Sequence, residues 1–106
     1  MPDIVFDVTD QDIEVVTNHL KVLSNPDRLK ILRHLIDGEI NVQTIEKLTE
    51  IHQPTLSQQL TVLRKSEMVS TRRDGKQIFY QIADPKVLVL MQTFYDLYCE
   101  EPAELL

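Results

Sequence analysis

The sequence predicts a mainly α-helical domain with a small β-hairpin. Between residues 10 and 66, apolar residues recur at helical spacing, and helix-start residues precede the runs. Between residues 68 and 82 the pattern changes to alternation of β-branched and aromatic residues around Asp74-Gly75. With 106 residues, 42% of them hydrophobic, the chain suffices for one core, so we expect a single domain over residues 1–106.

The first two predicted helices have clear start signals. Thr9, with Asp12 three residues later, resembles a capping box at the start of a helix over residues 10–23. Asn25 can cap a second helix that has Pro26 in its first position, and Gly38 ends it. The predicted inward stripe of the second helix is Leu29, Leu32, Leu35 and Ile36.

Two further short helices are predicted, separated by a tight connection. Val42, Ile45 and Leu48 mark one side of a helix over residues 42–49. Pro54 suits the first position of a fourth helix that runs to about residue 66. Its predicted buried face is Leu56, Leu60 and Leu63. Two short helices joined in this way form a helix-turn-helix.

A two-stranded wing and a last helix complete the predicted fold. Strands are expected over residues 68–73 and 77–82, and Asp84 with Pro85 begins a helix over residues 85–100. This helix is apolar on more than one face, so it needs a second surface, and a partner subunit is the simplest one. We therefore expect a homodimeric winged helix-turn-helix protein with five helices and a two-stranded wing.

The formal net charge of −6 conceals a strong asymmetry. Residues 1–20 hold five acids and no Lys or Arg, and residues 83–106 hold five acids and one Lys. By contrast, residues 53–82 hold five basic residues and two acids. Nucleic-acid binding needs positive potential only where the phosphates lie, so an acidic total does not exclude it.

The fourth helix and the wing carry side chains suited to double-stranded DNA. If the three leucines face the core, Gln, Ser and Thr turn to solvent, where they can hydrogen-bond base edges, and Arg can reach guanine or phosphate. The basic hairpin can lie along a phosphate backbone or enter a minor groove. The predicted major-groove contacts are Gln53, Thr55, Ser57, Gln58, Gln59 and Arg64. The predicted backbone or minor-groove contacts are Arg72, Arg73, Lys76 and Gln77.

These patterns also have plainer explanations. The polar side of the fourth helix can be an ordinary solvated surface, although solvated helices usually prefer Glu and Lys. The basic hairpin can protect an exposed strand edge against aggregation, and both roles are compatible. The alternative function is a winged-helix module that binds another protein and no DNA.

Other classes of function find little support. His19, His34 and His52 are scattered over three elements, and there is no glycine-rich phosphate loop, so we expect neither an enzyme nor a cofactor. No apolar run could span a membrane, and the N-terminal residues do not resemble an export signal, so we expect a cytoplasmic protein. The one cysteine, Cys99, fits a reducing compartment.

Over nearly its whole length the chain resembles the ArsR/SmtB family of bacterial winged-helix repressors. The similarity lies in "LKVLSNPDRLKILRHL" (20–35), "PTLSQQLTVLRKSEMVSTRRDGKQIFYQI" (54–82) and the closing helix. The resemblance implies a homodimer formed by the helices over 10–23 and 85–100, with the acidic ends at the dimer body. It also implies recognition helices in successive major grooves of a palindromic operator, and release of the DNA when an effector binds.

Most sensing positions of this family are occupied by other residues here. The Cys-x-Cys of arsenic and metal sensors and the two histidines of zinc sensors are replaced by Asn41, Gln43, Lys86 and Leu97. Asp84 and Glu100 remain at the zinc-sensing positions, but two acids are too few for a closed zinc site, so no metal is expected.

The phrase "FYDLYC" at 94–99 is similar to the persulfide and redox regulators of the BigR, SqrR and HlyU branch. Those sensors pair this cysteine with another in the second helix, where Arg33 stands here. Without a second sulfur, Cys99 is either a singly modified redox residue or an inert structural one. The resemblance thus implies a repressor or anti-silencer whose only candidate for a redox or sulfide response is Cys99.

Overall fold

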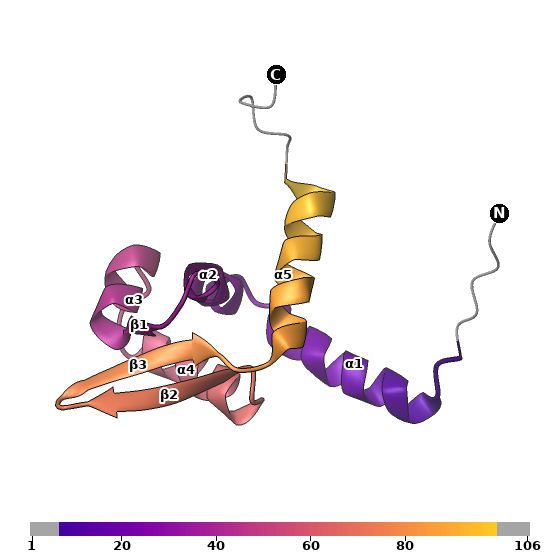
Figure 1. Cartoon of the computed structure of the whole chain (residues 1–106), viewed down its shortest axis with the longest axis horizontal. Coiled ribbons are helices and arrows are strands. Elements are labelled where there is room, and N and C mark those ends of the chain that lie inside the picture. Colours follow the sequence, from indigo (N-terminus) through magenta and orange to yellow (C-terminus); the bar gives the residue numbers. More distant parts are fainter. Residues whose placement is uncertain (1–6, 100–106) are drawn as a thin grey trace, which may run out of the picture.

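The computed structural model describes residues 7–99 and confirms the predicted fold class. Figure 1 shows α2, α3, α4 and the sheet in one body, from which α1 and α5 extend. Within the described residues no helix is long and apolar enough to cross a membrane. Residue 100, the predicted end of the last helix, lies outside them. In chain order the elements are α1 (Asp10–Leu23), α2 (Pro26–Leu35), β1 (Ile40–Asn41), α3 (Val42–Thr49), α4 (Thr55–Lys65), β2 (Val69–Asp74), β3 (Gln77–Ile82) and α5 (Pro85–Tyr98).

Side-chain caps begin the helices largely where the sequence predicts. Thr9 and Asp12 form the expected capping box, and both of its N–H···O distances are 3.1 Å. Asn25 and Asp84 cap α2 and α5 by accepting a first-turn N–H at 3.0 and 2.9 Å, respectively. Asn41 caps α3 in the same way at 2.8 Å, although we did not predict this cap.

The cap of α5 also lies against α1. The Asp84 carboxylate accepts the backbone N–H of Lys86, and its Oδ2 lies 3.6 Å from Nε2 of His19. The hydrogen bond from the backbone N–H of Lys86, together with the positive charge of Lys86 and the nearby His19 ring, holds the pKa of Asp84 below its usual range. Asp84 is therefore ionised at neutral pH, where it stabilises the start of α5 next to α1.

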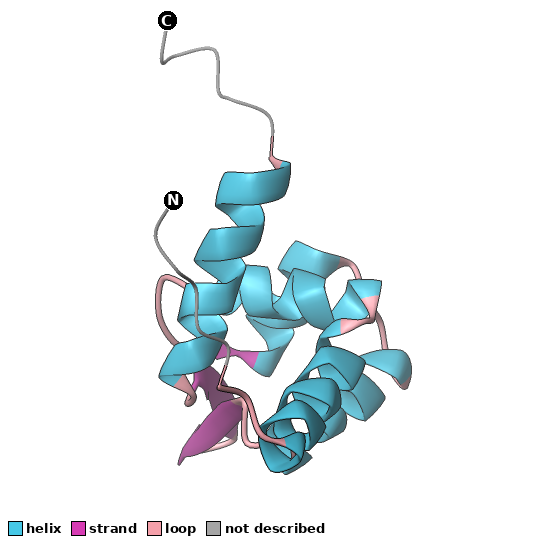
Figure 2. Ribbon diagram, turned by 90° about the vertical axis from the view of Figure 1, so that its right-hand side faces the viewer, coloured by secondary structure: helices cyan, strands magenta, loops and turns pink. Residues whose placement is uncertain are grey.

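An apolar core lies between the helical body and one face of the sheet, which Figure 2 shows on one side of the helices. The three predicted leucines of α4 are all buried in it. The core residues are Leu23, Ile31, Leu32, Leu35, Ile45, Ile51, Leu56, Leu60, Leu63, Met68, Val69, Tyr80 and Val87.

The prediction that Ile36 faces inward is wrong, and Leu48 departs from the side of α3 that the sequence predicts it to share with Val42 and Ile45. Ile36 is 42% exposed because it lies just beyond the end of α2, and Ile31 takes its place in the core. Leu48 of α3 is 48% exposed, whereas its neighbour Thr49 is buried. Thr49 tolerates burial because its hydroxyl donates to a carbonyl of α3 (2.7 Å) and accepts the N–H of Ile51 (3.2 Å).

The wing belongs to a three-stranded antiparallel sheet, and the prediction of two strands is therefore incomplete. The strand order is β1-β3-β2, and β1 pairs with β3 through Ile40 opposite Tyr80 and Asn41 opposite Phe79. A strand of two residues is too short to show an alternating pattern, so no sequence signal predicts β1.

The hairpin turn lies one residue further along the chain than predicted. Asp74 is the last residue of β2 and pairs with Gln77, so the loop consists of Gly75 and Lys76. Gly75 has φ +64°, as tight two-residue hairpin loops require. Lys76 consequently occupies the tip of the wing.

Arg28 connects three helices. Its Nε donates to the Val22 carbonyl at 2.6 Å and its Nη2 to the Lys21 carbonyl at 3.3 Å, both in the last turn of α1. Its Nη1 donates to Oε1 of Gln59 in α4 at 2.8 Å. The half-buried guanidinium thus satisfies terminal carbonyls of α1 while it fixes α4 against α2.

We expect Arg28→Ala to lower the free energy of unfolding by about 2–3 kcal/mol, because hydrogen bonds to a charged, half-buried group are lost and Gln59 loses its donor. Urea denaturation of the purified protein measures this loss. Lys30→Ala, which removes an exposed cation from the same helix, is the control and should change stability by less than about 0.5 kcal/mol. Equal effects of the two substitutions would contradict a structural role for Arg28.

Candidate nucleic-acid interface

α3 and α4 form the predicted helix-turn-helix. Ile51 is buried in the connection, and α4 begins one residue later than predicted, with Pro54 as its N-cap. The Pro54 side chain cannot cap the helix, and the side chain of Gln53 caps it instead. Its Oε1 accepts the Ser57 N–H at 3.0 Å and the Ser57 hydroxyl at 2.6 Å. Gln53 therefore stabilises the first turn of α4.

Burial of the three leucines turns the opposite side of α4 to solvent. Gln58 lies on that side and is exposed, and Arg64 is exposed near the C-terminal end of the helix. Within residues 7–99, neither side chain makes a hydrogen bond or an ion pair. Both side chains are thus available to a partner outside the chain.

The other predicted residues of α4 are less free. Gln59 is half-buried and accepts from Arg28, and Thr55 is also half-buried. Ser57 is exposed, but its hydroxyl donates to Gln53. The structure therefore places Ser57, Gln58 and Arg64 on the exposed surface of α4, with the other three at its margins.

Two further residues belong to the exposed face of α4 and were missing from the predicted set. Thr61 and Lys65 follow Gln58 by three and seven residues, so they lie on the same side of the helix. Lys65 is exposed, whereas Thr61 is half-buried and its hydroxyl donates to the Ser57 carbonyl at 2.8 Å. The helical period already predicts that Thr61 turns to solvent, and the same spacing from Gln58 could have identified Lys65.

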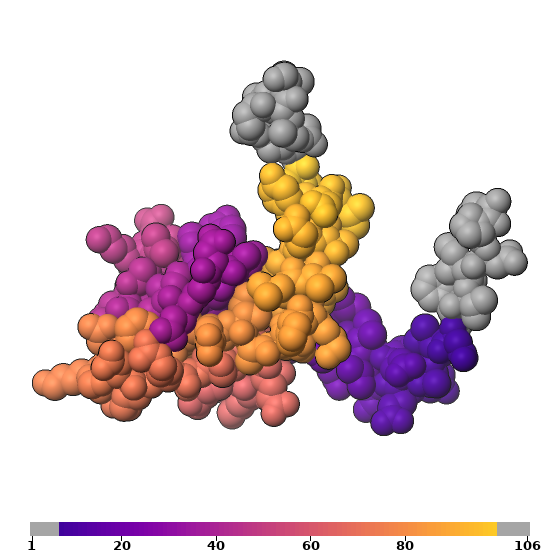
Figure 3. All heavy atoms as spheres, viewed as in Figure 1, coloured from indigo at the N-terminus to yellow at the C-terminus, as the bar shows by residue number. Residues whose placement is uncertain are grey.

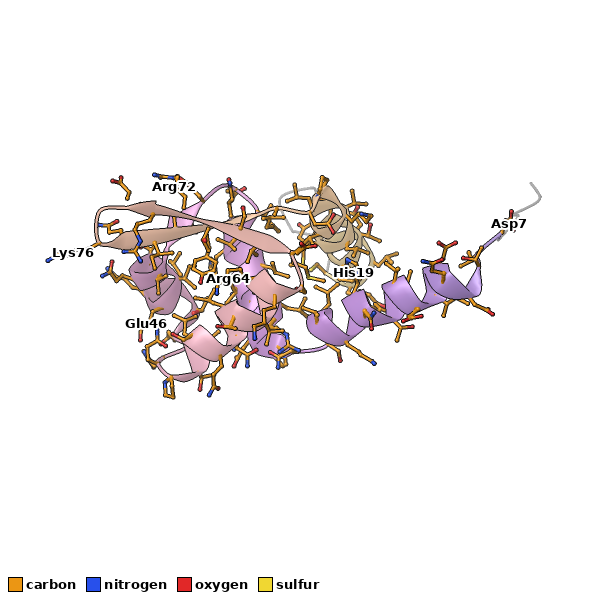
Figure 4. All side chains as sticks on the ribbon, turned by 90° about the horizontal axis from the view of Figure 1, so that it is seen from below. Asp7, His19, Glu46, Arg64, Arg72 and Lys76 are labelled. Carbon is orange, nitrogen blue, oxygen red and sulfur yellow. The ribbon has the colours of Figure 1, made fainter. Side chains whose placement is uncertain are left out.

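The four wing residues predicted to contact DNA fall into two groups, according to whether their side chains interact with other residues of the chain. Arg73 and Lys76 are exposed and, among the described residues, have no side-chain partner. Arg72 and Gln77 are engaged with the segment around β1, because Arg72 pairs with Glu39 and Gln77 accepts from Asn41 Nδ2 at 3.0 Å. Figure 4 shows Lys76 at the wing tip and Arg72 on the side of the hairpin away from α3 and α4.

The ion pair between Arg72 and Glu39 shifts the pKa values of both side chains. The hydrogen bond from Arg72 and its positive charge hold the pKa of Glu39 below its usual range, while Glu39 raises the pKa of Arg72. Both groups are therefore charged across the physiological pH range.

The acidic and basic parts of the chain lie far apart. Figure 4 shows Asp7, before α1, at the opposite end of the molecule from Lys76. The longest dimension of the molecule is 55 Å. The basic wing and α4 are thus separated from the acidic start of α1.

The described residues contain few other side chains that could react or bind a metal ion. Cys99 is exposed at the C-cap of α5. Over residues 7–99, no group of three or more His, Cys, Asp or Glu side chains could hold a metal ion. Glu100, the second acid at the zinc-sensing positions, lies outside this range.

Sequence comparison identifies related regulators. The family model for "Bacterial regulatory protein, arsR family" matches residues 25–71, from the cap of α2 into β2. A biofilm growth-associated repressor of Xylella fastidiosa (strain Temecula1 / ATCC 700964) is 46% identical over 86 residues, which cover 81% of this chain and 75% of that protein. The transcriptional activator HlyU of Vibrio cholerae is 35% identical over 81 residues, which cover 76% of this chain and 75% of HlyU.

Solved structures agree with these relatives. The transcriptional repressor BigR from Xylella fastidiosa superposes with a TM-score of 0.80 at 44% identity, over 89% of this chain and 100% of BigR. The homodimeric winged helix-turn-helix DNA-binding domain of Mb0332 from Mycobacterium bovis gives 0.72 at 30% identity, over 93% of this chain and 94% of that domain. With the helix-turn-helix and wing described above, these similarities show that the chain belongs to the arsR family of bacterial regulatory proteins, as a winged-helix transcriptional regulator and not an enzyme.

Proposed function

We propose that the protein is cytoplasmic and forms a homodimer. The homodimer binds a palindromic operator in double-stranded DNA, where it regulates transcription without a metal or cofactor. The observation that carries this proposal is the exposed polar side of α4, together with the exposed basic residues Arg73 and Lys76 of the wing. The relatives described above include a repressor and an activator. Because the repressor is the more similar of the two, we infer a repressor or anti-silencer.

In this proposal α4 enters a major groove and the wing holds the phosphate backbone or a minor groove. Gln58 and Arg64 have free side chains for base edges, and Ser57 lies beside them. Gln53, Thr55 and Gln59 border this surface, and the hydrogen bonds of Gln53 and Gln59 also help to fix α4. Arg73 and Lys76 supply the positive charge of the wing.

The dimer is supported by apolar surface on α1 and α5. Of the fourteen residues of α1 only Leu23 is buried, while Val16 is 53% exposed and Val89 of α5 is 65% exposed. These two valines line a groove of about 620 Å³ between the helices. Figure 3 shows the open space between the projecting parts of α1 and α5. A second copy would cover this apolar surface with the same surface of its own, as twofold symmetry requires.

We expect the wild-type protein to bind the DNA upstream of its own gene with an affinity that falls steeply as salt rises, because phosphate contacts release counterions. Arg64→Ala should weaken this binding by about 1–3 kcal/mol if Arg64 contacts a base. Fluorescence anisotropy at several salt concentrations measures both effects. Arg33→Ala, which removes an exposed arginine of α2, is the charge-matched control and should bind like the wild type. Binding that is insensitive to salt would favour the protein-interaction module instead.

We expect Val16→Glu to dissociate the dimer, because a carboxylate would be buried in the apolar interface. The fold of the subunit should persist, since Val16 is half-exposed within one chain. Sedimentation equilibrium measures the mass, and circular dichroism checks the fold. Thr17→Glu places the same charge on the next residue, which does not line the groove, and should leave the dimer intact. Equal masses for the two variants would contradict this interface.

We expect polysulfide treatment to change operator affinity only weakly. Cys99 is exposed, and the chain has no second cysteine that could bridge it to α2. The comparison uses anisotropy before and after treatment, with Cys99→Ser as the matched control. A large loss of affinity in the wild type that is absent from Cys99→Ser would show that Cys99 is a switch by itself.

A further inference from the structure

Arg72 makes several interactions within the chain. Its Nε donates to Oε2 of Glu39 at 3.1 Å, and its Nη2 donates to Oε1 of the same carboxylate. The guanidinium carbon lies 4.6 Å from the centroid of the Phe79 ring, and Nη1 is 3.9 Å from Oδ2 of Asp74. This two-pronged, stacked geometry is the one in which arginine differs most from lysine.

The strand register places Arg72 and Arg73 on opposite faces of the hairpin. Successive residues of a strand alternate in direction, so Arg73 shares the face of Tyr80, which turns to the core. Arg72 shares the outer face with Phe79, its partner across the ladder. Figure 4 agrees, since Arg72 lies on the side away from α4.

The outer face carries a cluster that spans all three strands. Arg72 of β2 reaches across Phe79 of β3 to Glu39, which immediately precedes β1. Beside it, Asn41 of β1 donates to Gln77 of β3. We call these five residues the outer-face cluster. Because β1 has only two residues, these side chains add contacts that its short ladder cannot provide.

We propose that Arg72 is a positioning residue, which with Glu39 fixes the wing against β1, and that the phosphate contacts of the wing come from Arg73 and Lys76. This inference rests on the proposed function and deepens it, because it selects which face of the wing meets DNA. The sequence predicts that Arg72, Arg73, Lys76 and Gln77 all contact DNA, and the proposal reduces this set of four to Arg73 and Lys76. Gln77, the other member of the cluster in that set, then has the same positioning role through Asn41.

Salt dependence separates a phosphate contact from a positioning residue. In Arg73→Gln, the slope of log affinity against log salt should become shallower by about one, because one phosphate contact is lost. In Arg72→Gln the slope should match the wild type, and affinity should fall about two- to fivefold, as expected for loss of an exposed ion pair. Arg72→Lys keeps the charge but loses the fork, so it should resemble Arg72→Gln. A shallower slope in Arg72→Gln, or wild-type affinity in Arg72→Lys, would overturn the inference.

A charge swap provides the rescue experiment. The double variant Glu39→Arg with Arg72→Glu restores an ion pair across the outer face without a change in net charge. It should bind DNA more tightly than Arg72→Glu alone and approach the wild type. If Arg72 contacts a phosphate, the swap instead places a carboxylate against that phosphate, and binding stays as weak as in the single variant.

Hydrogen exchange in the free protein tests the same cluster without DNA. Glu39→Gln should speed exchange of the amides in the pairing of β1 with β3, whereas Arg73→Gln should not. Unchanged protection in Glu39→Gln would overturn the positioning role even if DNA binding is confirmed. Conversely, a wild-type protein that shows no salt-sensitive DNA binding would refute the proposed function, while exchange still decides whether the cluster holds the sheet.

Discussion

The orientation of α4 on α2 is the constraint on which the candidate interface depends. Burial of Leu56, Leu60 and Leu63 selects the side of α4 that faces the core, and the helical period then decides which polar residues face outward. Apolar burial has no preferred direction, so it leaves the rotation of the helix only approximately fixed. The hydrogen bond from Arg28 to Gln59 adds the directional contact that leucines lack. A non-polar face and one polar bond together determine what α4 presents.

The distribution of charge explains how an acidic chain can present a surface for DNA. At physiological ionic strength, the field of an exposed charge is screened over about 8 Å. The molecule is 55 Å long, and the acidic start of α1 lies at the other end from the wing tip. The acids near α1 therefore contribute little to the potential at Arg73 and Lys76. The total charge of −6 describes the whole chain, whereas a DNA partner would experience the local charge.

The sequence predicts the elements well because their signals are local. Three helices are capped by Thr9, Asn25 and Asp84, each of which bonds to a residue no more than three positions away. The hairpin turn likewise depends on the positive φ of a single residue, Gly75. The wrong inward residue, Ile36, lies just beyond the end of α2, where helical periodicity no longer decides direction. In α3, Thr49 follows Val42 by seven residues and is buried, whereas Leu48 is exposed.

The contacts that position the candidate interface depend on residues distant in sequence. Arg28 and Gln59 are 31 residues apart, and Glu39 and Arg72 are 33 residues apart. Strand alternation places Arg72 and Arg73 on opposite faces, but no local pattern shows that Glu39 lies beside Arg72. Only the pairing of the three-stranded sheet, including the undetected β1, brings Glu39 to the face of Arg72.

The weak internal support of α1 connects dimer formation with the orientation of α4. A helix of fourteen residues is marginal alone in water, and α1 buries only Leu23 within one chain. Its order therefore depends on its cap and on whatever covers its exposed valines. The last carbonyls of α1 accept from Arg28, whose remaining donor holds Gln59 of α4. A partner subunit that covers the exposed valines of α1 would therefore also stabilise the two carbonyls that hold the Arg28 guanidinium in place. Arg28 thus connects the surface proposed for the partner subunit with the helix proposed for DNA binding.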